Sequence, residues 1–590
     1  MEATIPAEVS GPPLAEPPTP HALAGLWHWA VTEPTRPLLA HHDGEAFVEH
    51  TAARLREGVR DLAAGLIARG VAPGERVALL ACTGVDWVYA DSAILAAGAV
   101  SVPIYDTSSP QQIERILADS GCVLLLVETV EQRRALAGPA AALPAAPEVL
   151  AFEDGAATRL AEEGRGHHEE VEARVAALAG DDLAALLYSS GTTGEPKGCK
   201  LSHANLCANA RQTAEQVPEL FEPGARTLVF LPLAHALARI QLQTSLEQGV
   251  LTGLATSLER LSAELAAFRP TFIVAVPRIF EKVYGAARAK AAEAGRQRVF
   301  DRAADVARRW SEARRGRGAS WWLRAQHRLF DRLVFGRLRA AFGGELELAI
   351  CGGAPLEPDL GRFFDGIGVT VLPGYGLTEA SPIVSGGPVD GVDYDTVGEV
   401  FPATTVRLAD DGEILVAGPQ VFGGYWRDPA ATAAVLEDGW LRTGDLGRLT
   451  PEGRLAITGR KKEILVTAGG KNVVPGPLAE RVRAHPLVEH VVVVGEGRAF
   501  VGALVFLDHD ELARRGIDPT PPLDEAALRA ELDGVVAEAN EAVSCGEAIR
   551  AYRIIAAPLT IGAGELTPTQ KLRRRPVEDR FADEIEALYA

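Results

Sequence analysis

The sequence predicts an α/β protein with a large N-terminal domain of stacked βα sheets and a small α+β domain after it. The length of 590 residues gives room for two to four domains with buried cores. From about residue 45, stretches with the hydrophobic period of a helix alternate with short β-branched runs, which is typical of βα units in a largely parallel sheet. After residue 460 the pattern shortens into strands with helices between them, as in a small α+β domain.

The first elements of the large domain have clear local signals. Gly70 ends the first amphipathic stretch. Ser109 begins the third helix, because a serine cap, Pro110 at the first helical position and Gln112 three residues after the cap form a capping box. Helices are expected over 51–69, 86–97 and 110–120, and strands over 76–81, 100–104 and 122–127.

Later apolar runs predict further strands and a ligand-binding edge. Ligands of open α/β sheets bind beyond the carboxyl ends of strands. Runs that end in polar or glycine-rich residues lie at 228–233, 271–276, 346–351 and 369–372, and strands of the small domain are expected over 487–494 and 499–507. We place the boundary at Arg460, which gives a large domain, 21–460, and a small domain, 461–590.

Residues 1–20 contain glutamates and six prolines but no basic region followed by an apolar core. We therefore expect a disordered tail and no secretory signal. The longest apolar stretch, around 93–104, is too short for a membrane span. The six cysteines are scattered without a CxxC pair, which argues against a cysteine zinc site and a disulfide framework and favours the cytoplasm.

The charge of the chain is acidic overall. The formal net charge of −20 disfavours a nucleic-acid-binding protein. Only eight of the 59 basic residues are lysines. Because a compact ammonium and a planar guanidinium are not interchangeable, we expect local roles for the lysines that remain.

The stretch 286–340 is locally basic. Residues 296–339 contain thirteen arginines and four acidic residues, a local charge of +9. The first interpretation is a helical insertion with a solvated charged face. The second interpretation gives weight to the tryptophans at 310, 321 and 322 and predicts peripheral docking on an anionic membrane surface. The sequence leaves both interpretations open.

The strongest chemical signal is the run Tyr188-Ser-Ser-Gly-Thr-Thr-Gly-Glu-Pro-Lys-Gly198. Its glycines let the backbone turn N–H groups towards a polyanion, and its hydroxyls and Lys197 supply further donors. The Gly-x4-Gly-Lys-Ser/Thr spacing of a Walker A loop is absent, so a P-loop NTPase is a poor match. By itself, such a stretch is also common in ordinary turns.

With Leu201-Ser-His-Ala-Asn205 behind it, this run resembles the phosphate-loop signature of the adenylate-forming superfamily. That superfamily includes acyl-CoA synthetases, luciferases and the adenylation domains of peptide synthetases. Five further stretches resemble its motifs in the same order, namely 351–356 (CGGAPL), 374–379 (GYGLTE), 441–445 (LRTGD), 459–463 (GRKKE) and 566–571 (LTPTQK).

The resemblance implies a nucleotide site. Asp445 would hold the ribose hydroxyls, since an ionised carboxylate offers two acceptor oxygens, and Arg460 would bridge ribose and phosphate. The full set of implied ATP- or AMP-binding residues is Ser190, Gly191, Thr192, Thr193, Gly194, Gly353, Ala354, Pro355, Tyr375, Gly376, Asp445 and Arg460.

The implied reaction joins two anions, a carboxylate and the α-phosphate of ATP, so the site must neutralise charge that develops at phosphorus. The implied catalytic residues are Lys571, Lys197, Thr378 and Glu379. Mg²⁺ is the implied metal cofactor, with Glu379 as its anchor and a hydroxyl of Ser189 in support, because this hard cation prefers oxygen ligands.

The resemblance also implies that the small domain is mobile. Lys462 occupies the hinge position, and rotation about it would remove Lys571 from the site after pyrophosphate leaves. The loop with Gly469 and Gly470 would then reach the place where the thiol of coenzyme A attacks the acyl-adenylate.

Three features resemble the long-chain acyl-CoA synthetases in particular, namely 98–109, 276–284 and the arginine-rich insertion. They imply an apolar tunnel for an alkyl chain, in which each buried methylene contributes about 0.8 kcal/mol. His235 is the implied gate of that tunnel.

The predicted function is therefore that of a long-chain fatty acid–CoA ligase. Its predicted partners are fatty acid, ATP and coenzyme A, and its predicted products are acyl-CoA, AMP and pyrophosphate. One alternative is a fatty acyl-AMP ligase or adenylation enzyme that loads a separate carrier protein, and another is a non-catalytic adenylate-binding protein. The predicted location is the cytoplasm, with peripheral association at the inner membrane face.

Overall fold

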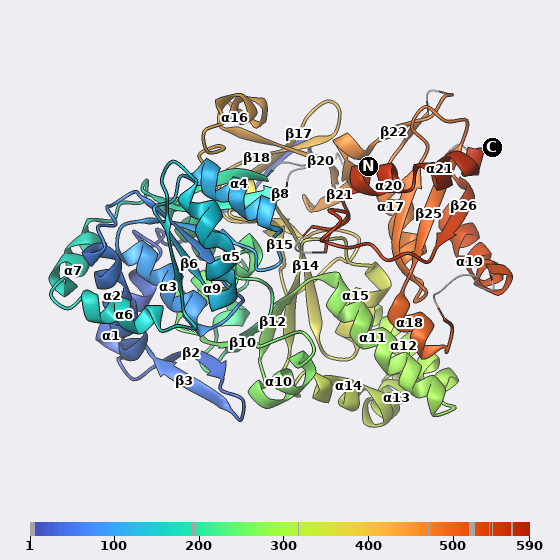
Figure 1. Cartoon of the computed structure of the whole chain (residues 1–590). Helices are drawn as coiled ribbons and strands as arrows, with labels where there is room; N and C mark the ends of the chain where they lie inside the picture. The colour runs from blue at the N-terminus through green and yellow to red at the C-terminus, as the bar shows by residue number, and fades with distance from the viewer. Residues whose placement is uncertain are drawn as a thin grey trace. The chain divides into compact units, whose positions relative to one another are not determined.

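The structure is a computed structural model (Figure 1). It describes residues 6–190, 196–316, 318–469, 471–518, 525–541, 543–544, 547–567 and 570–589. The chain divides into two compact units. Unit 1 contains residues 1–407, 415–442 and 449–455, and unit 2 contains residues 408–414, 443–448 and 456–590.

One sheet of unit 1 has six strands in the order β7-β6-β4-β5-β8-β9. Its neighbouring strands are parallel except β8 and β9, which form an antiparallel hairpin. The strands predicted over 76–81, 100–104 and 122–127 are confirmed as β4, β5 and β6. The strands are β4 Arg76–Leu80, β5 Val100–Ile104, β6 Leu124–Val127, β7 Glu148–Ala151, β8 Leu183–Ser190 and β9 Pro196–Ser202.

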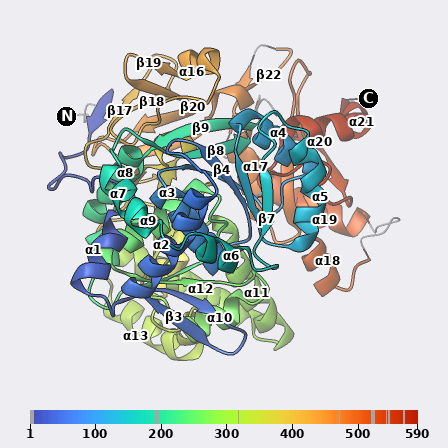
Figure 2. The ribbon, with the colours of Figure 1, turned by 60° about the vertical axis from the view of Figure 1, so that its left-hand side comes forward.

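Helices cover this sheet, and Figure 2 shows α4 and α5 lying along it. The predicted capping box begins α4, because Ser109 Oγ accepts from the Gln112 N–H (3.3 Å) and Gln112 Oε1 accepts from the Ser109 N–H (2.9 Å). The three predicted helices are confirmed as α2, α3 and α4. The helices are α2 Ala52–Ala68, α3 Val85–Ala96, α4 Pro110–Ser120, α5 Val130–Ala141, α6 Ala156–Glu163 and α7 His168–Ala177.

The second sheet of unit 1 has nine strands in the order β16-β15-β14-β13-β12-β10-β11-β2-β3. The run from β14 to β2 is parallel, and β15, β16 and β3 are antiparallel additions. The four later apolar runs of the sequence form β10, β12, β13 and β14. The strands are β2 Pro37–His42, β3 Phe47–Thr51, β10 Arg226–Val229, β11 Leu251–Leu254, β12 Phe272–Ala275, β13 Leu348–Cys351, β14 Thr370–Gly376, β15 Ile383–Gly386 and β16 Glu399–Val400.

Helix α9 is buried on most of its surface, in keeping with its lack of a polar face. It packs beside α8 and next to the strands of the nine-stranded sheet. This places it directly behind the carboxyl edge of β10. The helices of this part of unit 1 are α1 Ala24–Thr32, α8 His203–Gln216, η1 Pro218–Phe221, α9 Ala236–Gln248, α10 Leu261–Phe268, α15 Pro358–Gly366 and η3 Thr378–Ala380.

The arginine-rich stretch is helical. Its members are α11 Pro277–Glu293, α12 Gln297–Arg315, α13 Trp321–Phe330, the π-helix η2 Asp331–Phe335 and α14 Gly336–Ala341. The apolar side of α12 joins the same hydrophobic cluster as the aromatic residues of α15, through Phe300 and Phe363. This cluster includes the β10, β12, β13 and β14 strands, so the insertion shares the core of the large unit.

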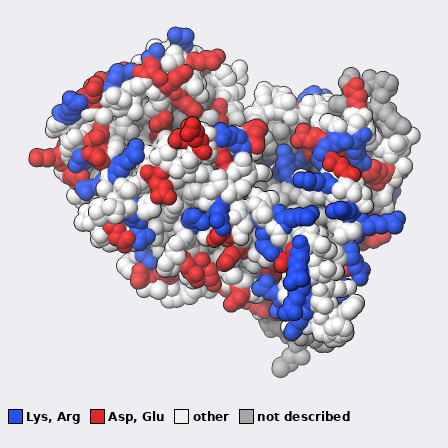
Figure 3. All heavy atoms as spheres, turned by 90° about the horizontal axis from the view of Figure 1, so that it is seen from below, with Lys and Arg blue, Asp and Glu red and all other residues white. Residues whose placement is uncertain are grey.

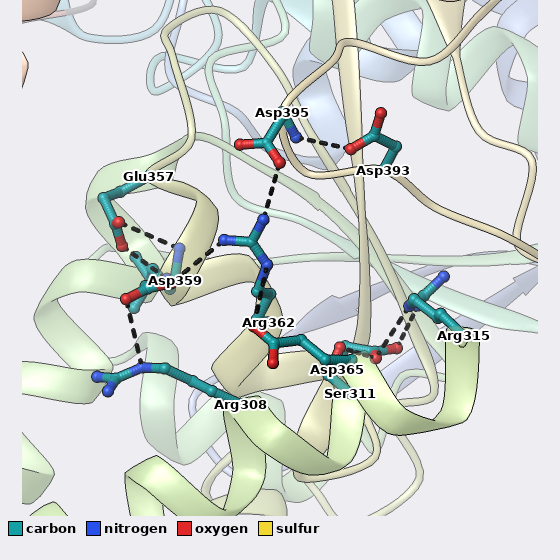
Figure 4. Close-up of polar contacts among 11 residues, drawn as sticks. Arg308, Ser311, Arg315, Glu357, Asp359, Arg362, Asp365, Asp393 and Asp395 are labelled. Atoms are coloured by element: carbon teal, nitrogen blue, oxygen red, sulfur yellow. Dashed lines mark hydrogen bonds and ion pairs between the residues drawn. The ribbon is translucent and has the colours of Figure 1, made fainter. Parts of the chain in front are cut away.

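Ion pairs fasten α12 to α15 beside that apolar contact (Figure 4). Asp365 is fully buried and accepts from Arg315 Nη2 (2.6 Å) and Ser311 Oγ (2.5 Å). Arg362 bridges Asp359 (3.2 Å) and Asp395 (2.8 Å). A buried carboxylate is stable only when it is paired, so the position of α12 is tightly specified.

The expectation of a disordered tail over 1–20 is wrong for part of that range. Strand β1 (Glu8–Ser10) pairs antiparallel with β17 (Thr405–Leu408), and this pairing satisfies its backbone groups. Gly11 follows it because a Cβ there would lie 2.0 Å from the carbonyl oxygen of Phe401. The third sheet has the order β1-β17-β18-β20-β19 with β21 beside β20, and its other elements are β18 Glu413–Ala417, α16 Pro429–Val435, β19 Leu436–Glu437, β20 Trp440–Leu449 and β21 Leu455–Arg460.

Unit 2 is built on the three-stranded sheet β24-β25-β26. Alternate residues of β24 enter two separate hydrophobic clusters, one shared with α17 and α19 and the other with α20 and α21, so the sheet is buried on both faces. The strands predicted over 487–494 and 499–507 are confirmed as β24 and β25. The elements are η4 Lys461–Glu463, β22 Leu465–Val466, β23 Asn472–Val473, α17 Pro475–Arg483, β24 Val488–Val494, β25 Val501–Leu507, α18 His509–Arg514, α19 Glu525–Asn540, β26 Ile549–Ile555, α20 Arg574–Arg580 and α21 Ala582–Tyr589.

Unit 2 differs from the predicted small domain in one respect, because it also takes in two short stretches that precede residue 456. The boundary at Arg460 stays a prediction. No helix in the described ranges has both the length and the apolar character needed to cross a bilayer.

Candidate active site

The predicted phosphate loop connects the antiparallel strands β8 and β9. Ser189 and Ser190 end β8, and their backbones pair with Lys197 and Pro196 of β9. The predicted residues Gly191, Thr192, Thr193 and Gly194 lie outside the described residues. The hairpin therefore presents Lys197 at the base of the loop, one residue from the start of β9.

A segment from later in the chain supports β9 on its other side. The backbones of Cys199 and Tyr425 form an isolated antiparallel bridge, and the Trp426 N–H donates to the Gly198 carbonyl (2.7 Å). Gly198 allows this approach, since a Cβ there would lie 3.0 Å from the Tyr188 ring and 3.3 Å from Trp426 Cβ. The phosphate-loop hairpin is thus packed between two aromatic residues.

Tyr425 connects two of the predicted catalytic residues. Its hydroxyl donates to Glu379 Oε1 (2.8 Å), and Lys197 Nζ lies 5.3 Å from its ring centroid, within cation–π range. Burial and the neighbouring Glu379 raise the pKa of Tyr425, so the phenol remains a proton donor at neutral pH. Asp428 Oδ2 lies 3.7 Å from Lys197 Nζ and also attracts the ammonium towards the segment that carries Tyr425.

The sequence interpretation missed Tyr425. The available signal was the run Phe-Gly-Gly-Tyr-Trp at 422–426, in which two glycines precede an aromatic pair. Glycines of this kind indicate a close approach of backbones. The run alone does not say which strand approaches.

Thr378 and Glu379 lie in η3, immediately after β14. Replacement of Gly376 at the end of β14 would force the neighbouring backbone to move, because a Cβ there would lie 2.0 Å from the Pro382 carbonyl oxygen. The Phe422 N–H donates to the Glu379 carbonyl (2.9 Å). Both the backbone and the side chain of Glu379 are therefore held by the 422–425 segment.

The predicted adenine turn lies at the same edge of the nine-stranded sheet. Gly353, Ala354 and Pro355 follow β13, and Gly353 has a φ of +82°, which favours glycine. Strand β13 is parallel to β14 with Cys351 opposite Pro373, so this turn and Tyr375 leave adjacent strands in the same direction. The three turn residues are exposed. This edge is where an open α/β sheet binds ligands.

His235 caps the N-terminus of α9. Its Nδ1 accepts from the Leu237 N–H (3.1 Å), which places a neutral ring's proton on Nε2, and its ring lies edge-on to Tyr105. The described structure supports a positioned histidine at the start of a buried helix.

A small pocket of about 20 Å³ lies beside α9 and begins at Leu237, two residues after His235. It lies between α9, α8 and strands β12, β13 and β15, and most of its lining is apolar. Its lining residues are Thr213, Leu220, Phe221, Leu237, Ile240, Gln241, Thr244, Ser245, Phe272, Val274, Ile350 and Ile383. Its apolar lining suits an alkyl group.

In unit 2, Asp445 and Arg460 form an ion pair. Arg460 Nε lies 2.8 Å from Asp445 Oδ1, and the Asp445 N–H donates to Thr443 Oγ1 (3.1 Å). The Asp445 side chain is buried while about half of the Arg460 side chain is exposed. The carboxylate is thereby held in one orientation.

Lys571 lies near this pair, at the return of a tight turn. The Thr567 N–H donates to the Lys571 carbonyl (2.8 Å), and the Lys571 N–H donates to Thr567 Oγ1 (2.9 Å). The residue as a whole is exposed, yet desolvation of its ammonium and the charge of Arg460 lower the pKa of Lys571, with Asp445 partly offsetting them. The structure thus brings Lys571, Asp445 and Arg460 together within unit 2.

The two neighbouring lysines of the hinge region differ in their contacts. Lys461 Nζ contacts Asp411 Oδ2 (2.5 Å) and Glu413 Oε2 (3.1 Å), and these hydrogen bonds raise the pKa of Lys461. Lys462, the predicted hinge residue, is exposed in η4. Gly469 is exposed in a turn, and Gly470 lies outside the described residues.

Glu379 is the candidate metal ligand of this site. The described part of the chain contains no cluster of three or more His, Cys, Asp or Glu side chains that could hold a metal ion. Mg²⁺ is usually bound by one or two carboxylates together with substrate phosphates, so a single positioned carboxylate is sufficient. Glu379 fits this role, because its Oε1 is fixed by Tyr425 and its side chain is only partly buried.

The chain is similar to known proteins over most of its length. A family model described as AMP-binding enzyme matches residues 26–426, and one described as AMP-binding enzyme C-terminal domain matches residues 462–590. The chain is 45% identical to the long-chain-fatty-acid–CoA ligase FadD15 of Mycobacterium bovis over 91% of its length and 92% of that protein.

Two more distant similarities are informative. The chain is 28% identical to an Arabidopsis thaliana chloroplastic long-chain-fatty-acid–[acyl-carrier-protein] ligase, AEE15, over 92% of this chain and 82% of that protein. The fold is similar to that of the O-succinylbenzoate coenzyme A synthetase of Bacillus subtilis solved with ATP and a magnesium ion. That likeness has a TM-score of 0.69 at 20% identity, and it covers 94% of this chain and 98% of the other.

Proposed function

The chain belongs to the AMP-binding enzyme family, and we infer that it is a long-chain fatty acid–CoA ligase. The observation that carries this inference is the 45% identity to a ligase of that activity over nearly the whole of both chains. A fatty acid, ATP and coenzyme A are its substrates.

In the first half-reaction, a carboxylate oxygen of the fatty acid attacks the α-phosphorus of ATP. A new phosphorus–oxygen bond forms, the bond to the bridging oxygen breaks, and pyrophosphate leaves. Lys197 and Thr378 are proposed to donate to phosphate oxygens, and Lys571 to the charge that develops in the transition state. The support for Lys197 is its position at the base of the phosphate loop, fixed by Tyr425 and Asp428.

The nucleotide is proposed to lie along the carboxyl edge of β13 and β14. Asp445 would accept from the ribose hydroxyls, and the support for this role is a buried carboxylate already oriented by Arg460. The remaining proposed contacts are Ser190, Gly191, Thr192, Thr193, Gly194, Gly353, Ala354, Pro355, Tyr375 and Gly376.

Glu379 is proposed to hold Mg²⁺, with Ser189 as a further ligand. When bound, the ion would neutralise charge on the phosphates of ATP. The contribution of the chain itself is the orientation of the carboxylate, because Tyr425 holds one oxygen of Glu379.

The acyl chain is proposed to occupy the cavity lined by α9, with His235 as its gate. The support is the adjacency of the two, since Leu237 both donates to His235 and lines the cavity. Displacement of the imidazole would break that capping bond, at a cost of about 1 kcal/mol.

In the second half-reaction, the sulfur of coenzyme A attacks the acyl carbonyl carbon and AMP leaves. Lys462 is proposed as the hinge, and the loop with Gly469 and Gly470 as the surface that meets the thiol-bearing arm. The support is the exposure of Lys462 beside the anchored Lys461. The second candidate acceptor is a carrier protein, and the similarity to AEE15 supports it.

We also propose peripheral association with an anionic membrane face.

The test is an assay of purified protein with ATP, Mg²⁺ and acids from two to twenty carbons, with and without coenzyme A. The expected result is AMP and acyl-CoA from long-chain acids. No AMP from any acid would overturn the proposed function. Acyl-adenylate that is transferred to an acyl carrier protein but never to coenzyme A would favour the second acceptor.

A further inference from the structure

We propose that the cleft between α12 and α13 binds the phosphate groups of anionic phospholipids, and that Trp321 and Trp322 enter the lipid interface beside it. The proposal rests on the proposed function in one respect, because a ligase for long-chain acids gains from contact with the phase in which those acids dissolve. The site itself is argued from α12 and α13 alone.

The cleft is a defined feature of the insertion. It has a volume of about 530 Å³, and its lining residues are Trp310, Arg314, Gly318, Ala319, Arg324, His327 and Arg328. Trp310 and His327 stack at 4.2 Å with ring planes 21° apart, and His327 Nε2 is 2.7 Å from the Gly366 carbonyl oxygen. The aromatic pair forms a fixed part of the cleft lining.

Three arginines of this cleft lack acidic partners. Among the described residues, Arg314, Arg324 and Arg328 have no carboxylate within ion-pair distance, although Arg324 Nε donates to the Ala319 carbonyl (3.1 Å). Elsewhere in the insertion, Arg288 pairs with Asp301 and Arg315 with Asp365, whereas no ion pair is seen among the described residues for Arg296, Arg298, Arg332 and Arg337. Three unpaired cations therefore line this one cleft.

Exposed apolar side chains lie next to these cations. Trp321 is 75% exposed and Trp322 57% exposed. Leu329 and Leu333 are 55% and 50% exposed. Monomeric soluble proteins seldom leave two adjacent tryptophans in water, whereas tryptophan is enriched at the membrane–water interface. The apolar group is too small for a bilayer span and suits shallow insertion.

The spacing along α13 joins the two features. Trp321, Arg324 and Arg328 recur at the i, i+3 and i+7 positions of one helix face, and Trp322 and Leu329 recur at i and i+7 on the neighbouring face. The opposite face carries Leu323 and Phe330, which are buried in the core.

A helix of this kind lies in the plane of a membrane surface with its apolar stripe down and its arginines at the level of the phosphates. Helices α13 and α14 lie at the bottom of Figure 1, and Figure 3 shows the molecule from below. Figure 3 shows basic side chains on this face.

The chemistry favours lipid phosphate over an acidic protein partner. Guanidinium groups bind phosphate oxygens in a bidentate manner, and they bind the carboxylates of an acidic carrier protein in the same way. The arginines alone therefore do not distinguish the two partners. Only a lipid surface also accounts for the exposed Trp321, Trp322 and Leu329. The net charge of −20 makes a local basic site necessary, because an anionic surface repels the rest of the chain.

The experiment measures co-sedimentation of the full chain with vesicles of phosphatidylcholine, alone or with one third phosphatidylglycerol. The cleft variant is Arg314→Gln/Arg324→Gln/Arg328→Gln. The matched control is Arg54→Gln/Arg134→Gln/Arg165→Gln, which removes three exposed arginines elsewhere. Each basic residue near such a surface contributes about fivefold, so the cleft variant is expected to bind anionic vesicles about 100-fold more weakly than the control variant.

A second variant, Trp321→Ser/Trp322→Ser, tests insertion. It is expected to abolish the blue shift of tryptophan fluorescence that anionic vesicles produce in the unsubstituted chain. Equal vesicle binding by the cleft and control variants would overturn the proposal. So would binding of free inorganic phosphate by a chain that does not bind anionic vesicles, or capture of acyl carrier protein but not of vesicles.

Ligase activity on octanoate without vesicles separates this proposal from the proposed function. Both variants are expected to keep that activity, because they lie outside the catalytic residues, and this also shows that they fold. An inactive chain that still binds vesicles would overturn only the function, and an active chain that ignores anionic vesicles would overturn only the docking site.

Discussion

Tyr425 donates its phenolic hydrogen to Glu379 Oε1 across 2.8 Å. The ammonium of Lys197 lies over the same ring, so one tyrosine contacts both a carboxylate and a cation that the proposed mechanism uses. We expect Tyr425→Phe to keep the ring and lose the hydrogen bond. Hydrogen bonds to charged groups contribute about 1.5–3 kcal/mol, so adenylation should slow at least tenfold and require more Mg²⁺.

The measurement for Tyr425→Phe is pyrophosphate release during an Mg²⁺ titration. Tyr552→Phe is the matched control, since it removes a comparable bond to Asp533 (2.6 Å) in unit 2. An unchanged Mg²⁺ requirement in the first variant would show that Tyr425 only supports the fold.

Lys571→Ala should slow adenylation by roughly 10²–10³, the usual scale for loss of one transition-state donor. Thioester formation from supplied acyl-adenylate should survive, because in the proposed mechanism Lys571 has left the site by then. The two half-reactions are measured separately, by pyrophosphate release and by acyl-CoA formation. Equal loss in both would refute the proposal that Lys571 serves only one of them.

The pH dependence of adenylation should show the lowered pKa of Lys571. Its ammonium form is the active donor, and a lowered pKa means that the proton is lost at a lower pH than from an ordinary lysine. The rate should therefore fall on the alkaline side below the usual lysine range. In Lys571→Arg, which keeps its charge, the alkaline decline should move to higher pH, and a profile identical to that of the unsubstituted chain would contradict the assignment.

Filling the cavity beside α9 should shorten the preferred acyl chain. Ile240→Trp places a larger side chain in the lining, and each methylene that can no longer be buried costs about 0.8 kcal/mol. The ratio of kcat/KM for sixteen-carbon over eight-carbon acids should fall, while Gln248→Ala at the end of the same helix should leave it unchanged. A preserved ratio in Ile240→Trp would place the acyl chain elsewhere.

Removal of the buried carboxylate at α15 should loosen the helical insertion. Asp365→Ala leaves Arg315 and Ser311 without their acceptor, and breaking a buried pair in this way costs about 3–5 kcal/mol. The expected result is earlier urea unfolding and faster proteolysis within 297–341. Asp305→Asn, at an exposed site, is the control and should change neither.

The sequence analysis was most successful where local signals decide structure. The capping box at Ser109 and strand β5 were predicted to the residue, since both depend on neighbours in the chain. Strand β1 was not predicted, because its partner β17 lies about four hundred residues away and the tail has no local strand pattern of its own. Long-range pairing of this kind leaves little trace in either segment.

The same distinction holds for the site. Lys197, Glu379, Asp445 and Lys571 stand in recognisable motifs, whereas the bond from Tyr425 to Glu379 joins residues 46 positions apart and neither has a motif for it. The unpaired arginines of the cleft also required the structure, because the sequence counts charges but does not show which of them already have partners.

The contacts of Lys461 change how the small domain can be handled experimentally. Its two acidic partners, Asp411 and Glu413, come from a stretch that precedes the hinge by about fifty residues, yet they belong to the same compact unit. A fragment cut at residue 460 would discard those partners and leave the lysine without counter-charges. Exchange of the small domain between relatives should therefore transplant 408–414 and 443–448 together with the C-terminal segment.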